Sequence, residues 1–236
     1  MAAGGTTAGV LVAAAVLGVT HGFEPDHAAG ISALTSDTDG WRHAAFVGGS
    51  FAVGHVVVVL AWVALLTLVG RTATAAPAGI DTAGTLLAGS VLVAVALLLA
   101  ATGTRRLRGL PARPTASGTS GPVSRTLAYA HDHLHAHDHQ TRTDYLRTSV
   151  VGSLFALSPP VSMLALVSAV LPTSGMDATG LAIVAYAVVL TATMGFVGTG
   201  LGGVFSLARG RSRRVHAAVE LASSAVVLAF AVSLFA

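Results

Sequence analysis

The chain has 236 residues, of which 53% are apolar and only 10% are charged, and its mean hydropathy is +0.76. A water-soluble domain of this length needs more charge on its surface, so the composition excludes an ordinary soluble protein. The absence of cysteine excludes structural disulfides, thiolate metal sites and dithiol relays. The positive charge comes from arginines that lie between apolar segments, which favours a role in membrane topology over nucleic-acid binding.

Six apolar segments are long enough to cross a bilayer whose hydrocarbon core is about 30 Å thick. The sequence therefore predicts an all-α, polytopic membrane protein with six transmembrane helices. The first segment lacks a basic region before it and a small-residue cleavage site, so we expect it to remain as a helix of the mature protein. The predicted spans are about 6–34, 43–70, 82–104, 147–172, 178–207 and 214–236.

The arginines predict how these spans are oriented. Twelve of the thirteen lie in the loops that follow the first, third and fifth spans, and only Arg71 lies on the other side. The positive-inside rule then places both termini outside and the loop 105–146 in the cytoplasm, and we expect the membrane to be the plasma membrane. The twelve are Arg42, Arg105, Arg106, Arg108, Arg113, Arg125, Arg142, Arg147, Arg209, Arg211, Arg213 and Arg214.

The six spans form two groups of three on either side of the long loop. Because three is odd, a second copy of the unit enters the membrane the other way up, which predicts two inverted three-helix repeats. The first span of each group contains a proline break, at Glu24-Pro25 and at Ser158-Pro159-Pro160. Paired breaks are typical of a transporter's binding site, and two ordinary proline kinks are the alternative. The predicted units are the first repeat, the loop and the second repeat, at 1–104, 105–146 and 147–236.

The first span carries a cluster of ionisable residues, which are costly in a membrane and therefore functional candidates. A polar helix end in water is the alternative reading. On a straight helix, His21 and His27 would lie about 9 Å apart along the axis, whereas two nitrogens on one metal ion lie within about 4.2 Å of each other. A break at Gly22 and Pro25 would bring them together. The candidate metal ligands here are His21, Asp26 and His27, with Glu24 as a ligand or a proton acceptor.

The second span contains Gly54-His55, followed by four valines. A lone histidine in an apolar helix is more often a packing residue, but the first span offers ligands at a similar depth, so we predict that His55 is a further ligand. We expect Gly54 to lie where the first two helices meet. In the last span, His216 and Glu220 are four residues apart and share a face. They could serve ion passage or proton coupling, and a surface pair at the membrane edge is the favoured interpretation.

The long loop holds half of the ten histidines, in alternation over nine positions. Imidazole binds Ni, Co, Cu and Zn rather than Mg or Ca, and histidine-rich tracts usually bind metal. The rest of the loop is polar and rich in glycine, proline and arginine, so we predict a disordered segment that captures metal without selecting it. The histidines are His131, His133, His135, His137 and His139.

Two of these motifs resemble those of the nickel/cobalt transporter (NiCoT) family. The stretch from His21 to Asp26-His27 is similar to its His-x4-Asp-His motif, and Phe51-x-x-Gly54-His55-x-x-Val-Val is similar to its second motif. The sequence His-Gly-Phe-Glu-Pro at 21–25 and the histidine-rich loop also resemble those of the related nickel/cobalt efflux proteins. The chain departs from the family in having six predicted spans instead of eight. It also departs at the third motif, where the corresponding break, at 157–160, has no acidic residue.

Together, these patterns predict a secondary transporter that moves Ni²⁺ and/or Co²⁺, with the bilayer and the metal ion as its partners and with no bound cofactor. Two alternatives stay open, a membrane metalloenzyme with a His/Asp-bound metal and a transporter for another divalent metal such as Zn²⁺ or Mn²⁺. The chain contains neither a P-loop nor a His-Glu-x-x-His motif, which favours a transporter without ATPase activity over an enzyme. The direction of transport, the coupling ion and the oligomeric state stay open.

Overall fold

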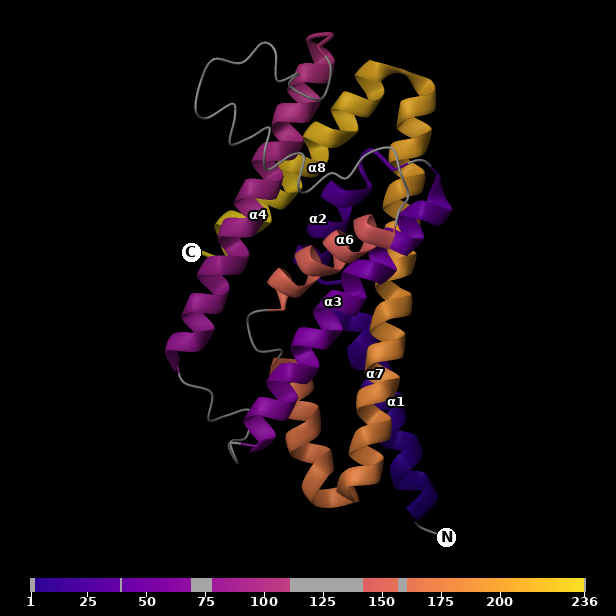
Figure 1. Cartoon of the computed structure of the whole chain (residues 1–236), viewed down its shortest axis with the longest axis vertical. Coiled ribbons are helices and arrows are strands. Elements are labelled where there is room, and N and C mark those ends of the chain that lie inside the picture. The colour runs from indigo at the N-terminus through magenta and orange to yellow at the C-terminus, as the bar shows by residue number, and fades with distance from the viewer. Residues whose placement is uncertain (1–2, 39, 69–77, 111–141, 157–160, 236) are drawn as a thin grey trace.

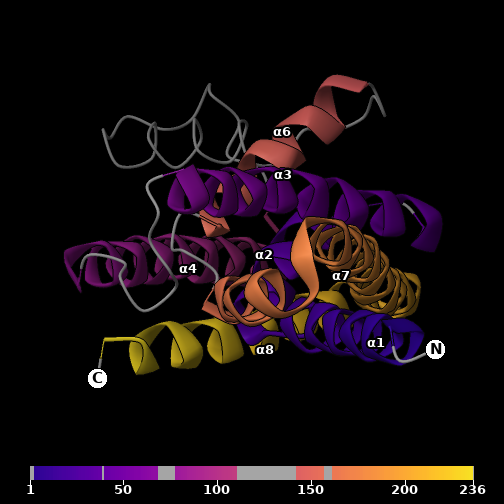
Figure 2. The ribbon, with the colours of Figure 1, turned by 90° about the horizontal axis from the view of Figure 1, so that it is seen from below.

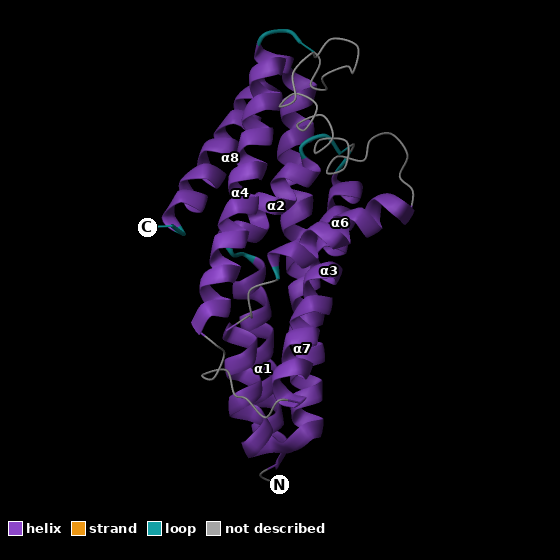
Figure 3. Ribbon diagram, turned by 60° about the vertical axis from the view of Figure 1, so that its left-hand side comes forward, coloured by secondary structure: helices purple, strands orange, loops and turns teal. Residues whose placement is uncertain are grey.

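The computed structural model describes residues 3–38, 40–68, 78–110, 142–156 and 161–235. Every element within these ranges is an α-helix (Figure 3), which confirms the all-α prediction. In chain order the helices are α1 (Ala3–Gly22), α2 (Pro25–Thr35), α3 (Trp41–Leu68), α4 (Ala78–Leu107), α6 (Arg142–Phe155), α7 (Val161–Arg211) and α8 (Arg213–Ser233).

Four of the described helices, α3, α4, α7 and α8, are long and apolar enough to cross a membrane, and α1 with α2 makes a fifth candidate if the bent pair is one span. Their outward faces are apolar. On α3, Val53 and Val57 are 52% and 60% exposed, whereas Phe51 on the opposite face is fully buried. Apolar side chains on the outside favour contact with lipid over water. The chain is therefore a membrane protein.

The first span is broken, as the proline predicts. The helix α1 ends at Gly22 and α2 begins at Pro25, and the two axes are bent by 55°. Glu24 between them has φ −58° and ψ 141°, an extended conformation that the residue before a proline favours. Proline then starts α2 at the position where its missing N–H costs nothing.

The second half departs from the predicted spans. The predicted span 147–172 corresponds to α6, which ends at Phe155, and to the first part of α7, while the proline break at 158–160 lies outside the described residues. Within α7, Gly175 has φ 78°, a left-handed conformation that glycine adopts at little cost. Figure 1 shows the ribbon turning back on itself there, which separates the predicted spans 147–172 and 178–207. At the edges of the predicted loop, α4 extends to Leu107 and α6 begins at Arg142.

Glycines let α3 and α7 cross in backbone contact. A Cβ on Gly48 would lie 2.2 Å from the carbonyl oxygen of Met194, and one on Gly198 would lie 2.3 Å from that of Ala44. Each helix thus offers a glycine to a carbonyl of the other. Small residues allow this approach where lipid leaves little hydrophobic driving force between helices.

The prediction that Gly54 lies where the first two spans meet is wrong. A Cβ on Gly54 would lie 1.7 Å from the carbonyl oxygen of Ser149 on α6, and one on Gly152 of α6 would lie 2.0 Å from the carbonyl oxygen of Phe51. The glycine beside His55 therefore serves the packing of α3 on α6. The glycines of α1 face α7 instead, because Gly18 and Gly22 meet Tyr186 and Thr193 of α7.

The short helix α2 occupies the middle of the molecule. Figure 2 shows it between α3 on one side and α1 and α8 on the other, and it contacts α3, α4, α6, α7 and α8. His27, Ile31 and Thr35, four residues apart along α2, are all fully buried. This position gives α2 two enclosed ends, and a cluster of polar side chains lies at each.

Candidate metal centre

Three histidines from three helices meet at the N-terminal end of α2. His21 lies in the last turn of α1, His27 lies in the first turn of α2 and His55 lies midway along α3. Each offers a ring nitrogen, and these nitrogens all lie within 4.8 Å of one another. The side chains are buried, with residue exposures of 9%, 0% and 2%. The break in the first span thus brings His21 and His27 together, as the spacing argument requires.

A hydrogen bond across the break sets the orientation of His27. Its Nδ1 lies 2.8 Å from the carbonyl oxygen of His21. A carbonyl oxygen can only accept, so Nδ1 carries the proton and donates, which leaves Nε2 with a lone pair. That Nε2 is buried and has no hydrogen-bond partner among the described residues. An oriented ring with one nitrogen bound to a carbonyl and the other free is how metal-ligating histidines are usually held.

His21 and His55 face each other at a distance that suits one shared ion. Their Nε2 atoms are 3.1 Å apart. Two nitrogens, each about 2.1 Å from an ion, are separated by about 3.0 Å at a right angle and about 3.4 Å at the tetrahedral angle. On the other edge of the His21 ring, Nδ1 lies 2.9 Å from Oε1 of Glu24. Since the carboxylate accepts, it favours the proton on Nδ1 and the lone pair on Nε2, toward His55.

The two carboxylates lie at the more exposed side of this cluster. The side chain of Glu24 is 47% exposed and that of Asp26 is 22% exposed. Oδ1 of Asp26 accepts a hydrogen bond from the backbone N–H of His27 at 2.8 Å, in the first turn of α2, where a negative charge is favourable. Glu24, Asp26 and His27 form a second group of potential ligands, so His27 belongs to both groups. Asp26 is therefore separate from the group of three imidazoles.

Residues 7–158 match the family described as NicO, high-affinity nickel-transport protein. This segment is more than half of the chain and contains both histidine motifs. The chain belongs to this family. The resemblance to nickel/cobalt transporters is thereby confirmed, and a divalent metal ion is the substrate that membership of NicO implies. No curated protein and no solved structure matches the chain.

An aromatic side chain that the sequence analysis missed packs beside the three-histidine cluster of this NicO protein. Tyr186 of α7 is 1% exposed, and its ring stacks near that of His21 with centroids 6.1 Å apart. The backbone of α1 approaches closely here, since a Cβ on Gly18 would lie 2.9 Å from the carbonyl oxygen of Tyr186. A lone tyrosine in an apolar segment carries no signal of this role, because the contact depends on how α1 packs on α7.

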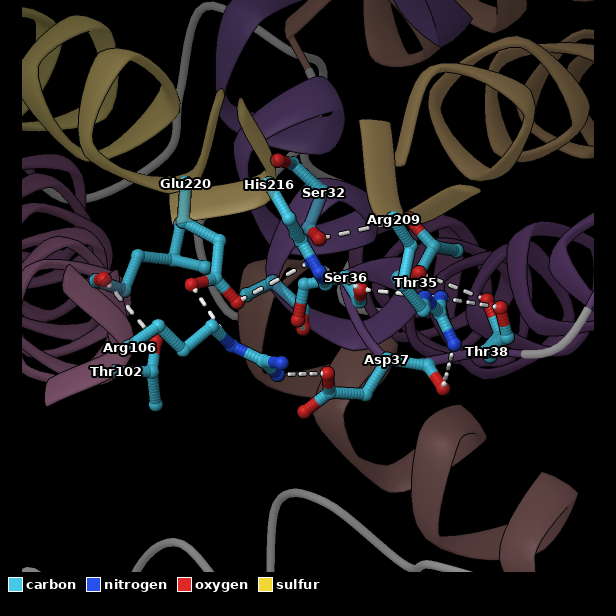
Figure 4. A network of polar contacts seen from close by, with 12 residues as sticks. Ser32, Thr35, Ser36, Asp37, Thr38, Thr102, Arg106, Arg209, His216 and Glu220 are labelled. Atoms are coloured by element: carbon cyan, nitrogen blue, oxygen red, sulfur yellow. Dashed lines mark hydrogen bonds and ion pairs between the residues drawn. The ribbon is translucent and has the colours of Figure 1, made fainter. Parts of the chain in front are cut away.

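The interpretation of His216 and Glu220 as a surface pair in this NicO protein is wrong. The two residues are 1% and 0% exposed, and they form a third group of polar side chains with Asp37 (Figure 4). Arg106, from the last turn of α4, places Nε 3.1 Å from Oε2 of Glu220 and donates through Nη2 to Oδ1 of Asp37. The predicted capture loop, from His131 to His139, lies outside the described residues.

Proposed function

We propose that the chain is a secondary transporter that moves Ni²⁺ and/or Co²⁺ across the plasma membrane, and that His21, His27 and His55 bind the ion in transit. The observation that carries the proposal is the meeting of three buried imidazoles at the broken first span. Buried histidines inside a membrane protein are costly unless they serve a function. Membership of NicO supports nickel as a substrate.

The donor set favours borderline transition metals. Three neutral imidazoles suit Ni²⁺, Co²⁺ and Zn²⁺, whereas Mg²⁺ and Ca²⁺ prefer oxygen ligands. Neutral imidazole binds metal and protonated imidazole does not, so the ion can be released without any covalent step. Glu24 and Asp26, at the more exposed side, supply negative charge that attracts a cation toward the imidazoles and can complete its coordination.

We propose six spans in two inverted repeats, with the site between the first and second spans, near the break in the first. In Figure 1, α1 with α2 rises, α3 descends and α4 rises, whereas the first part of α7 descends, the second part rises and α8 descends. The second half therefore runs opposite to the first. The reciprocal contacts of Gly48 and Gly198 at the crossing of α3 and α7 also support a two-fold relation between the halves.

The arginines support a cytoplasmic location for one end of the molecule. Arg105 and Arg106 lie in the last turn of α4, and Arg209 and Arg211 lie in the last turn of α7. These helix ends lie together in Figure 1, opposite the N-terminus. By the positive-inside rule, this end faces the cytoplasm, and so does the loop that carries the histidine tract.

Flux of radiolabelled metal tests the proposal. Reconstituted vesicles containing the full chain are expected to take up Ni²⁺ or Co²⁺, and vesicles containing His21→Ala or His27→Ala are expected to take up none while the proteins stay folded. Zn²⁺ and Mn²⁺ in parallel identify the preferred metal, and loading the vesicles with metal instead tests efflux. Equal flux by the wild-type chain, by both variants and by empty vesicles would overturn the proposal.

A further inference from the structure

The second polar cluster lies at the C-terminal end of α2, opposite to the histidine cluster. Its centre is Glu220 of α8, which is fully buried. Its Oε2 lies 3.1 Å from Nε of Arg106, and its Oε1 lies 3.6 Å from Nε2 of His216. Neither carboxylate oxygen has a partner with hydrogen-bond geometry among the described residues. A carboxylate that is completely buried and paired with a guanidinium, but without hydrogen-bond geometry among the described residues, is costly to keep ionised in a membrane.

The groups that face Glu220 come from every helix around it. Arg106 belongs to α4, Arg209 to α7, His216 to α8 itself, and Asp37 follows α2. Figure 4 shows Arg106 reaching toward both Glu220 and Asp37. Two guanidinium groups thus stand against two carboxylates, so the charges balance when His216 is neutral. Protonation of Glu220 removes one negative charge and leaves the cluster with an excess positive charge.

The same cluster holds the end of α2. Nη2 of Arg209 donates to the carbonyl oxygen of Thr38 at 2.9 Å, and its guanidinium also faces the carbonyl oxygens of Ser36 and Asp37 at 3.4 Å. Nε2 of His216 lies 3.2 Å from the carbonyl oxygen of Ser36. Cations and donors at a helix C-terminus satisfy carbonyls that have no partner within the helix. The position of α2 therefore depends on this cluster.

We propose that Glu220 is the site that binds and releases a proton in exchange for metal, and that α2 connects it to the histidine cluster. This inference rests on the proposed transport function and adds its coupling ion. His27 and Ser36 are nine residues apart, which is roughly 14 Å along a helix. At this distance, the proton and the metal do not compete for the same atoms, so the coupling acts through the position of α2.

The effect of the proton follows from the contacts. When Glu220 takes up a proton, its charge is lost and Oε2 no longer attracts Arg106. Asp37 is then the one carboxylate in the described cluster that opposes two guanidinium groups, which weakens the arrangement that anchors Ser36 and Thr38. Loss of the proton restores the pair with Arg106 and fixes α2 again. A helix held in one state and loosened in the other changes the position of His27 relative to His21 and His55.

Proton movement and metal movement in the same vesicles test this inference. Vesicles with the full chain and an entrapped pH indicator are given a Ni²⁺ gradient, and we expect protons to move against the metal. The Glu220→Gln variant is expected to lose this proton movement and the acceleration of Ni²⁺ flux by a pH gradient, while binding of Ni²⁺ to the protein persists. The matched control is Asp177→Asn, at an exposed carboxylate near Gly175, which is expected to keep both.

The outcomes separate this inference from the transport function. If the wild-type chain moves no Ni²⁺, the proposed function fails. If it moves Ni²⁺ without protons, or if Glu220→Gln still moves protons with Ni²⁺, the function stands and the proton site is overturned.

A measurement on the wild-type chain covers the case in which Glu220→Gln does not fold. Dicyclohexylcarbodiimide enters the lipid phase and reacts with protonated carboxyl groups there. Mass spectrometry is expected to find the adduct on Glu220, with more adduct as the pH falls and with the level of adduct changed by Ni²⁺. An unmodified Glu220 at every pH, or modification that is indifferent to pH, would overturn the assignment.

Discussion

Replacing His55 by alanine removes the one ligand that α3 contributes to the candidate metal centre. Its Nε2 lies 3.1 Å from that of His21, so the truncation leaves two imidazoles where there were three. Loss of an outer partner of a metal ligand weakens metal binding by about 10–100-fold, and loss of a direct ligand costs at least as much. We therefore expect Ni²⁺ to bind about 100-fold more weakly, which corresponds to about 2.8 kcal/mol.

Calorimetric titration of the purified full chain with Ni²⁺ measures this change. We expect the histidine-rich loop to bind metal as well, but the loop is the same in every variant, so differences between variants report on the helical site. His43→Ala is the matched control, because it removes an imidazole from the same helix, at the half-buried start of α3. We expect this control to retain the tight binding step.

A second substitution separates coordination from packing. His55 is 2% exposed, so alanine at this position leaves a cavity and lowers stability whatever the role of the ring. His55→Gln keeps most of the volume and removes the imidazole. If His55 is a ligand, both variants lose tight Ni²⁺ binding. Tight binding retained by a folded His55→Gln would refute the reasoning and return His55 to a packing role.

Three further predictions concern packing, pH and the loop. Gly54→Ala is expected to destabilise the protein by about 1–3 kcal/mol, because its Cβ would lie 1.7 Å from the carbonyl oxygen of Ser149. Gly49→Ala, where a Cβ meets open space, is the control and should leave the stability unchanged. Unfolding in detergent measures both variants, and equal stabilities would contradict the α3–α6 contact. Ni²⁺ affinity should fall on acidification, by up to about tenfold per pH unit for each imidazole that must lose a proton. An affinity that is constant from neutral to acidic pH would exclude imidazole ligands. Deleting 131–139 should leave flux measurable but change its dependence on cytoplasmic metal, and identical curves would remove the capture role.

Local features of the sequence were sufficient to predict the first half of the fold. The hydropathy of the second and third segments locates α3 and α4, because lipid requires a long apolar run for each crossing. The break between α1 and α2 follows from Pro25, which cannot continue a helix. The meeting of His21 and His27 then follows from the spacing of two ligands on one ion. Each of these inferences needs only residues that are near one another in the chain.

Contacts between distant segments could not be predicted in the same way. Arg106 and Asp37 are 69 residues apart, and nothing in either segment identifies the other as its partner. His216 and Glu220 were recognised as a pair on one face of the last span, but their burial depends on α2 and α4 covering that face. The partner of Gly54 was missed for the same reason, since α6 is a short helix with little hydropathy to place it.

The position of α2 explains why both clusters are enclosed. A straight first span would carry His21 and His27 about 9 Å apart, and neither could share an ion with the other. The 55° bend places α2 in the centre, where its N-terminal end meets α3 and its C-terminal end meets α4, α7 and α8. One break in the chain therefore creates the three-imidazole cluster and directs the other end of α2 toward Arg106, Arg209 and Glu220. A change in the angle of this break would alter both clusters together, because α2 is a single short helix with contacts fixed at its two ends.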